Sequence, residues 1–256
     1  MIRLGGMPPD TSFYLLAIPA VLLIGLAKGG LSGMGALGLP LLALAMEPVQ
    51  AAAILLPILI AQDVVGVVAF RKTWDKRILA IMLPGSIFGV ILGWWFAASV
   101  PSSMIMAAVG GISLLFGLYR LWIERGGRIA ASSNSPAWVG ALFGVATGFT
   151  SQIAHAGGPP YQMWVMPRRL ARDVFVGTTA IFFAALNWIK VPAYVALGQF
   201  TWANARITLV LLPFALLGSL AGVKLVRKVA MDRFYTIIYL LMVAAGAKLL
   251  WDGLGL

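Results

Sequence analysis

The sequence contains no cysteine, and that absence excludes several kinds of chemistry. Without thiols the chain forms no disulfides, has no cysteine nucleophile and offers no thiolate ligand to a metal. Histidine is almost as rare, because His155 is the only one. Only one aspartate lies in a segment near it, so we expect neither a metal nor another cofactor. The phosphate-binding pattern GxxxxGK followed by serine or threonine is also missing, which argues against ATP hydrolysis by this chain.

Charged side chains are scarce as well, at 11% of the 256 residues, whereas 61% are hydrophobic. The mean hydropathy is +0.95. Such a chain has too little polar surface to cover a water-soluble globule. It is therefore predicted to be an integral membrane protein that is built of helices and embedded in a lipid bilayer, with no separate soluble domain. Although the formal net charge is +11, the basic residues do not form a soluble face, so we expect no nucleic-acid partner.

Ten apolar runs follow one another along the chain, eight long and two short. The long runs cover residues 13–31, 51–70, 78–99, 104–123, 137–153, 174–197, 207–226 and 234–250, and the short ones 36–46 and 159–166. A helix needs about 20 residues to cross the hydrocarbon core. Each short run is predicted to form a hairpin with the helix before it, which leaves open whether 8 or 10 segments cross. The residues before the first run lack the features of a cleaved signal peptide, so we expect that run to be a retained helix.

The pattern of the first half returns in the second half. The stretch GLAKGGLSGMGALGLP at 25–40 corresponds to GVATGFTSQIAHAGGP at 144–159, at a shift of 119 positions. Further along, Pro84 and Gly89 correspond to Pro213 and Gly218 at a shift of 129. The sequence therefore predicts an all-α polytopic membrane protein of two structural repeats, residues 1–128 and 129–256. Each repeat would hold four long helices and a short helical segment after a Gly-rich break.

Basic residues predict how the two repeats lie in the membrane. Four segments, 71–77, 120–128, 168–172 and 224–233, hold 14 of the 19 lysines and arginines. By the positive-inside rule all four face the cytoplasm. Matching loops of the two halves then lie on opposite sides, which indicates an inverted repeat with its axis in the membrane plane. We expect a multi-pass protein of a bacterial inner membrane, the plasma membrane, with both termini outside and an oligomeric state that the sequence leaves open.

The two Gly-rich breaks are the predicted substrate site. Non-helical backbone at membrane depth is tolerated where it is buried in protein or lines a watered cavity. Glycines permit close approach, and the free amides of a broken helix favour an anion. The candidates at these breaks are Gly29, Gly30, Ser32, Ser151, Gln152, Gly157 and Gly158. The alternative interpretation is that these small residues only let helices pack closely.

Ionisable residues inside predicted spans are the second group of candidates. A charge at the bilayer centre costs about 2.5 to 3.5 kcal/mol on insertion scales, so each needs a partner or a role. Lys28, on the first break, either attracts an anion or forms an ion pair with Asp63, and the two roles are compatible. Asp63 and His155 are candidates for proton coupling, although a lone histidine is commonly just hydrogen-bonded.

Two further polar pairs occupy matching positions in the halves. Asn187 and Lys190 lie three residues apart, on one helical face. Gln62 and Asp63 fall in the corresponding turn of the first half. These pairs suggest two walls of one cavity. The alternative for Lys190 is that its side chain extends to the membrane interface.

The motifs GLAKGGLSGMGALGLP, IAHAGGPP and NWIKVPAY together resemble those of the sulfite exporter TauE/SafE family of membrane transporters. The resemblance implies a transporter of small sulfur-containing anions, sulfite or organosulfonates, and not an enzyme. It implies export by alternating access, with the anion bound at the Gly-rich breaks near the midplane. The motif positions are the glycine breaks, His155 with the glycines after it, and Asn187 with Lys190, whereas Lys28 is less typical. The alternative is an anion channel or uniporter of the same fold without ion coupling.

Overall fold

The structure, a computed structural model, describes residues 11–28, 34–127, 132–225 and 232–256. Within these residues all regular structure is helical. The first half contains α1 (Thr11–Lys28), the 3₁₀ helix η1 (Met34–Leu37), α2 (Gly38–Ala43), α3 (Pro48–Phe70), α4 (Lys76–Ser99) and α5 (Ser102–Glu124). The second half contains α6 (Ala137–Ala154), α7 (Gly158–Val165), the 3₁₀ helix η2 (Met166–Arg168), α8 (Arg172–Ala196), α9 (Trp202–Leu225) and α10 (Asp232–Leu254).

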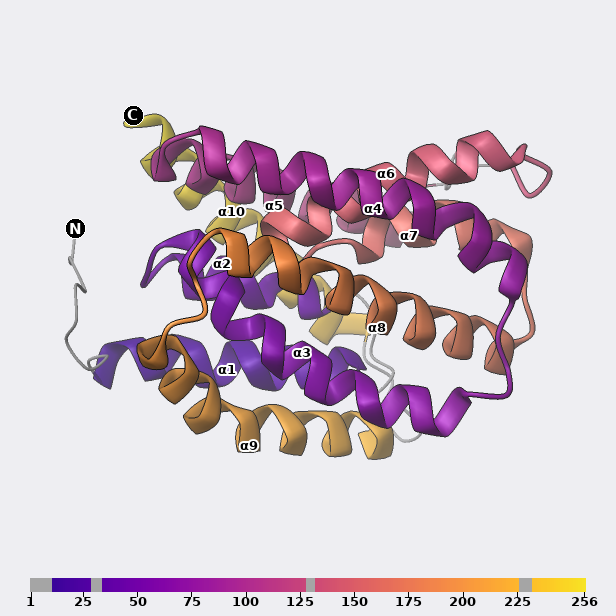
Figure 1. Ribbon diagram of the computed structural model, residues 1–256, viewed down its shortest axis with the longest axis horizontal. Coiled ribbons are helices and arrows are strands. Elements are labelled where there is room, and N and C mark those ends of the chain that lie inside the picture. The colour runs from indigo at the N-terminus through magenta and orange to yellow at the C-terminus, as the bar shows by residue number, and fades with distance from the viewer. Residues whose placement is uncertain (1–10, 29–33, 128–131, 226–231) are drawn as a thin grey trace.

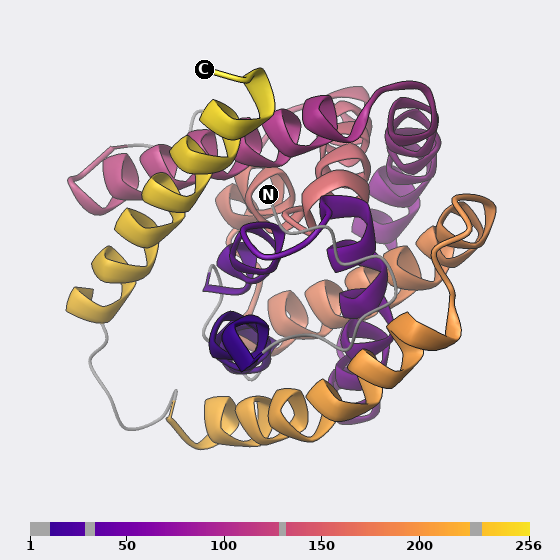
Figure 2. The ribbon, with the colours of Figure 1, turned by 90° about the vertical axis from the view of Figure 1, so that its left-hand side faces the viewer.

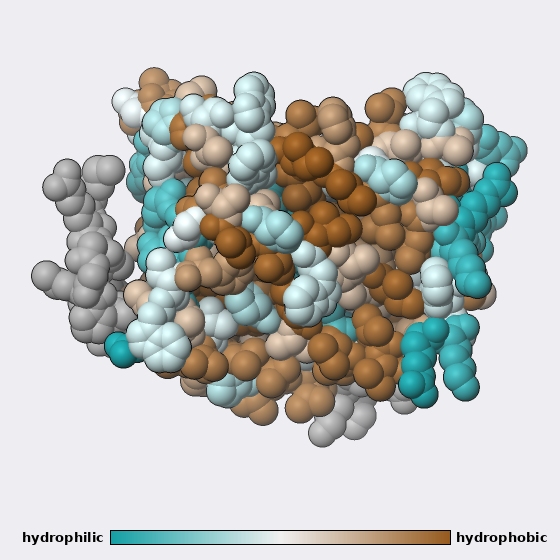
Figure 3. Space-filling model, in the orientation of Figure 1, coloured by the Kyte–Doolittle hydropathy of each residue, from teal (hydrophilic) through white to brown (hydrophobic). Residues whose placement is uncertain are grey.

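Each predicted apolar run overlaps one α-helix, although residues 29–31 of the first run and residue 226 lie outside the described residues. Seven helices among the described residues are long and apolar enough to cross a membrane, and the apolar part of α1, Phe13–Lys28, is shorter. Two others are single short pieces, since α2 has 6 residues and α7 has 8. Apolar side chains cover much of the middle of the surface, and hydrophilic ones gather at the ends (Figure 3). The prediction of a multi-pass helical membrane protein is confirmed.

Helix starts follow from local sequence. Asp75 caps α4, because its Oδ1 accepts hydrogen bonds from the backbone N–H groups of Arg77 and Ile78. Glu47 caps α3 in the same way through the N–H of Gln50, and Pro48 occupies the first turn, where no N–H is needed. The start of each helix is therefore fixed by a capping carboxylate.

The long helices α3, α4, α8 and α9 run in roughly the same direction across Figure 1, whereas α10 is strongly tilted, as Figure 2 shows. The start of α1 and the end of α10 lie at the same end of the molecule, and the α3–α4 and α7–α8 connections lie at the opposite end. That opposite end carries Arg71 and Lys72 after α3 and Arg168 and Arg169 after α7. We call it the basic end.

Helices from the two halves pack against each other in pairs. The main contacts are α5 with α10, α4 with α6, α1 with α9, and α3 with α8. If α1 to α5 are taken to correspond in order to α6 to α10, the α1–α9 pair corresponds to the α6–α4 pair. The α3–α8 and α5–α10 pairs each correspond to themselves, so the pairing has the symmetry expected of two similar halves. Figure 2 shows α1 nearly end-on, with α9 below it, α10 to its left and α3 to its right. The two halves therefore interdigitate and pack as one body.

Glycines let α4 and α6 approach until their backbones touch. A Cβ at Gly144 or Gly148 of α6 would collide with backbone atoms of Met82 and Ser86 on α4. The Ser86 hydroxyl also donates to the carbonyl oxygen of Gly144 over 3.0 Å. Small residues at a helix–helix contact in a membrane commonly have this function. For these two glycines of the second motif, close packing is therefore the correct interpretation.

We predict that Gly148→Ala destabilises the protein. The added methyl group meets the backbone of Ser86, which moves only if α4 and α6 separate, and overpacking of this kind costs about 1 to 3 kcal/mol. The measurement is the thermal unfolding midpoint in detergent. Gly111→Ala is the matched control, because a Cβ there meets no atom within 4 Å. Equal midpoints for the two variants would show that the close α4–α6 contact contributes nothing to stability.

Candidate functional site

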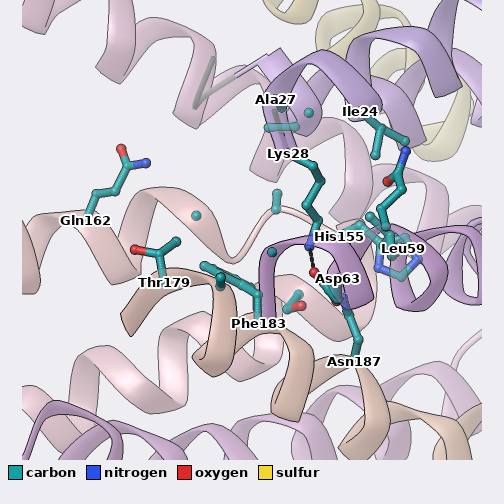
Figure 4. A pocket seen from close by; sticks show the side chains of 18 of the residues that line it. Ile24, Ala27, Lys28, Leu59, Asp63, His155, Gln162, Thr179, Phe183 and Asn187 are labelled. Carbon is teal, nitrogen blue, oxygen red and sulfur yellow. Dashed lines mark hydrogen bonds and ion pairs between the residues drawn. The ribbon is translucent and has the colours of Figure 1, made fainter. Parts of the chain in front are cut away.

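A cavity of about 270 Å³ lies where the two halves meet. Its walls come mainly from α1, α3, α7 and α8, with two residues of η1, the end of α6 and the turn after it, and single residues of α5 and α10. Figure 4 shows polar side chains from these helices converging on the cavity. Apolar side chains, among them Phe70, Phe175 and Phe183, line part of the wall.

The first polar cluster in the cavity is built around Asp63. Its Oδ1 forms an ion pair with Lys28 Nζ, and its Oδ2 accepts a hydrogen bond of 2.6 Å from Asn187 Nδ2. Asp63 is 5% exposed and the Lys28 side chain 24%. A buried ion pair is favourable only when its remaining hydrogen-bonding capacity is used, and Asn187 does this for the carboxylate. The cluster ties α1, α3 and α8 together.

The second cluster is built around Lys190. Its Nζ lies 2.8 Å from His155 Nδ1 and 3.2 Å from Ser151 Oγ. The side chain is 1% exposed, so the alternative that Lys190 extends to the membrane interface is wrong. His155 ends α6 in a left-handed conformation, with φ at 49°. That turn directs its ring across to α3, where Nε2 lies 2.8 Å from the carbonyl oxygen of Ala52.

These contacts determine the tautomer of His155. The carbonyl of Ala52 can only accept a hydrogen bond, so Nε2 carries a hydrogen. Nδ1 then accepts from the ammonium group of Lys190, which has donors and no acceptor. His155 and Lys190 together hold one positive charge. This charge has no carboxylate within 4.0 Å among the described residues.

The cavity as a whole is cationic. Three of its lining side chains are cations, Lys28, Lys190 and Arg120, and one is a carboxylate, Asp63. With His155 neutral, the formal sum is three positive charges minus one negative charge, which is +2. A cleft of one sign with low-dielectric walls concentrates counter-ions. The site is therefore suited to an anion.

The other predicted site residues differ in position. Gln62 and Gly158 line the cavity, whereas Gln152 and Gly157 do not. Gln62 is 2% exposed and donates through Nε2 to the carbonyl oxygen of Ala215 over 3.0 Å. Gln152 lies behind the site, where its carbonyl oxygen accepts from the Tyr194 hydroxyl over 2.6 Å. Gly29, Gly30 and Ser32 lie outside the residues that the structure describes.

The expected supply of free amides at the second break is limited. The residues that open α7 after Gly158 are Pro159 and Pro160, and neither has a backbone N–H. Gly157 and Gly158 are thus the amide donors at this point. Most of the positive character of the site comes from side chains rather than from a helix end.

Sequence reasoning missed Arg120. It was assigned to a basic loop, but it lies inside α5 and lines the cavity. Its Nη1 donates to Gln162 Oε1 over 3.3 Å, and its Nε and Nη2 donate to the Tyr239 hydroxyl over 3.0 and 2.8 Å. The available signal was its position within the apolar run 104–123. Gln162, Thr179 and Phe183 were also missed, because single polar or aromatic residues in apolar runs are common.

Comparison with known families matches the chain to the family described as Sulfite exporter TauE/SafE, over residues 17–249. No curated protein and no solved structure gives a significant match to the chain. The family match includes all the described residues that form the cavity.

We predict that His155 is the neutral tautomer with its hydrogen on Nε2. Because the chain has one histidine, labelling histidine with ¹⁵N gives a single pair of ring signals. Nuclear magnetic resonance should show a protonated Nε2 and an unprotonated, hydrogen-bonded Nδ1. In Lys190→Met the Nδ1 signal should shift, since its donor is removed. A hydrogen on Nδ1 in the native protein would contradict the assigned contacts.

Proposed function

The chain belongs to the sulfite exporter TauE/SafE family, and on this premise we propose that it is a secondary transporter exporting small sulfur-containing anions, sulfite or organosulfonates. The observation that supports this most directly is the cationic cavity between the two halves. Transport is proposed rather than catalysis because the family is described by an exporter activity.

In the proposed complex the anion lies between Lys28 and Lys190. Lys190 is fixed by His155 and Ser151, so its charge is already oriented when the anion arrives. Lys28 is more accessible and is paired with Asp63, so the anion competes with that carboxylate for it. Neutral donors, the amide groups of Gln62 and Asn187 and the N–H of Gly158, complete the site.

This competition provides a means of proton coupling. When the anion takes Lys28, Asp63 loses its cation, and uptake of a proton neutralises the buried carboxylate. Anion and proton then cross together, so export proceeds when the outward driving force on the anion exceeds the inward driving force on the proton. Asp63 is the main candidate for the coupling group, because both ring nitrogens of His155 are engaged. His155 is the second candidate, acting through its shared hydrogen bond with Lys190.

Alternating access is proposed from how the halves are held together. At the end away from the basic loops, Gln50 Nε2 donates to Asn204 Oδ1 over 2.8 Å, and the Thr208 hydroxyl donates to the Ile54 carbonyl oxygen over 3.0 Å. Toward the basic end the cavity continues to Phe70 and Phe175. We propose that this is an inward-facing state of an inverted repeat, 1–128 and 129–256. The basic end would face the cytoplasm of a bacterial inner membrane, with both termini outside.

We predict that Lys28→Ala and Lys190→Met greatly reduce anion transport while leaving membrane insertion intact. The measurement is uptake of radiolabelled sulfite into proteoliposomes, where each variant should fall to about a tenth of the native rate or less, because each loses a charged contact worth about 1.5 to 3 kcal/mol. Lys248→Met is the matched control, since Lys248 is exposed and pairs with Asp252 on α10. Native rates in both cavity variants would overturn the proposed site.

We also predict that native vesicles with an alkaline interior accumulate sulfite above its equilibrium level. Asp63→Asn should keep downhill flux and lose this accumulation, because an amide keeps the size of the side chain but takes up no proton. Accumulation in Asp63→Asn equal to that of the native protein would exclude Asp63 as the coupling group. Flux that only equilibrates in the native protein would favour a channel or uniporter.

A further inference from the structure

Arg120 brings a second centre of positive charge to the cavity. It lies four residues before the last residue of α5, which at 1.5 Å per residue is about 6 Å from the helix end. Within the described part of the chain no carboxylate lies within 4.0 Å of it. Glu124, one turn further along α5, instead accepts a hydrogen bond from the Thr236 hydroxyl on α10 over 2.9 Å. No ion pair with a described residue therefore neutralises the guanidinium charge of Arg120.

Neighbouring side chains hold this guanidinium group in place and leave some of its N–H groups without a hydrogen-bond acceptor among the described residues. Three of its five N–H groups are used, one by Gln162 Oε1 and two by the Tyr239 hydroxyl. Two remain. Because arginine only donates, the Gln162 oxygen is the atom that faces it, and both N–H groups of the Gln162 amide remain for another acceptor. Arg120 and Gln162 thus present up to four donors at one place in the cavity wall.

This place is separate from the lysine clusters. Figure 4 shows Gln162 and Thr179 on one side of the cavity and Lys28, Asp63 and His155 on the other. Gln162 lies three residues before the end of α7, next to η2 and the basic residues that follow it. Arg120 and Gln162 therefore lie where the cavity approaches the basic end.

We propose that Arg120 and Gln162 form a second anion-binding site, at the mouth of the cavity, which collects an oxyanion before it moves to Lys28 and Lys190. The fork of guanidinium donors matches the oxygens of a sulfite or sulfonate group, as it matches carboxylate and phosphate. The inference rests on the proposed transport function. It adds that anions arriving from the two sides of the membrane meet different residues first. The mouth site is met first only by anions that arrive from the basic end.

The test compares sulfite flux in the two orientations of membrane vesicles. In inside-out vesicles the basic end faces the added sulfite, and Arg120→Gln should raise the half-saturating concentration by about tenfold or more, since a charged hydrogen bond is lost. In right-side-out vesicles the same variant should change it by less than about twofold. The maximal rate should stay close to native in both. Arg125→Gln is the matched control, because Arg125 is an exposed residue at the end of the same helix.

A second variant covers the case in which Arg120→Gln folds poorly. Gln162→Glu keeps Arg120 and the size of its partner, and places a carboxylate against the guanidinium group. It should raise the half-saturating concentration in inside-out vesicles in the same way. An equal change in both orientations, or none in either, would overturn the mouth site. Absence of saturable sulfite flux in the native protein would instead overturn the proposed function.

Discussion

The centre of this protein depends on keeping two lysines charged inside a membrane domain. The two lysines are stabilised by different kinds of partner. Lys28 is paired with the Asp63 carboxylate, which is itself held by Asn187. Lys190 has no carboxylate partner among the described residues and is stabilised by His155 and the hydroxyl and carbonyl groups of Ser151. A charge held only by neutral acceptors remains available to an anion, whereas a paired charge must first exchange its partner. The arrangement therefore combines one fixed cation with one exchangeable cation.

Helix packing explains why these groups meet where they do. The tight pair α1–α9 also contacts α3, and the tight pair α4–α6 also contacts α8. Close backbone contacts at glycines such as Gly25 and Gly148 make each tight pair a firm unit. The first pair together with α3, and the second pair together with α8, form two units, which meet where α3 packs against α8. The hydrogen bond from Asn187 to Asp63 crosses this contact, so the polar cluster lies at the boundary between units that each take helices from both halves.

Hydropathy and charge were sufficient to predict the helices, because a membrane helix must be long, apolar and internally hydrogen-bonded. The same cost of buried charge identified Lys28, Asp63, His155 and Lys190, all of which the structure brings to the cavity. The sequence did not show which side of each helix would face the cavity. Gln152 sits one residue from Ser151 yet lies outside the cavity, because adjacent residues on a helix point about 100° apart. Arg120 was counted with a basic loop because it is the first residue of the basic segment 120–128, although it also lies within the apolar run 104–123.

The polar residues that α3 and α8 bring to their contact are complementary rather than identical, and this has a physical reason. The first half supplies Gln62 and Asp63, and the second supplies Asn187 and Lys190. Since α3 and α8 face each other, two identical carboxylates in these places would repel, and one would be protonated. An amide opposite the carboxylate gives a donor for an acceptor. The contact between two similarly placed helices can thus hold one asymmetric site, because its residues differ in hydrogen-bonding type, while glycines elsewhere let the helices of the packed pairs approach closely.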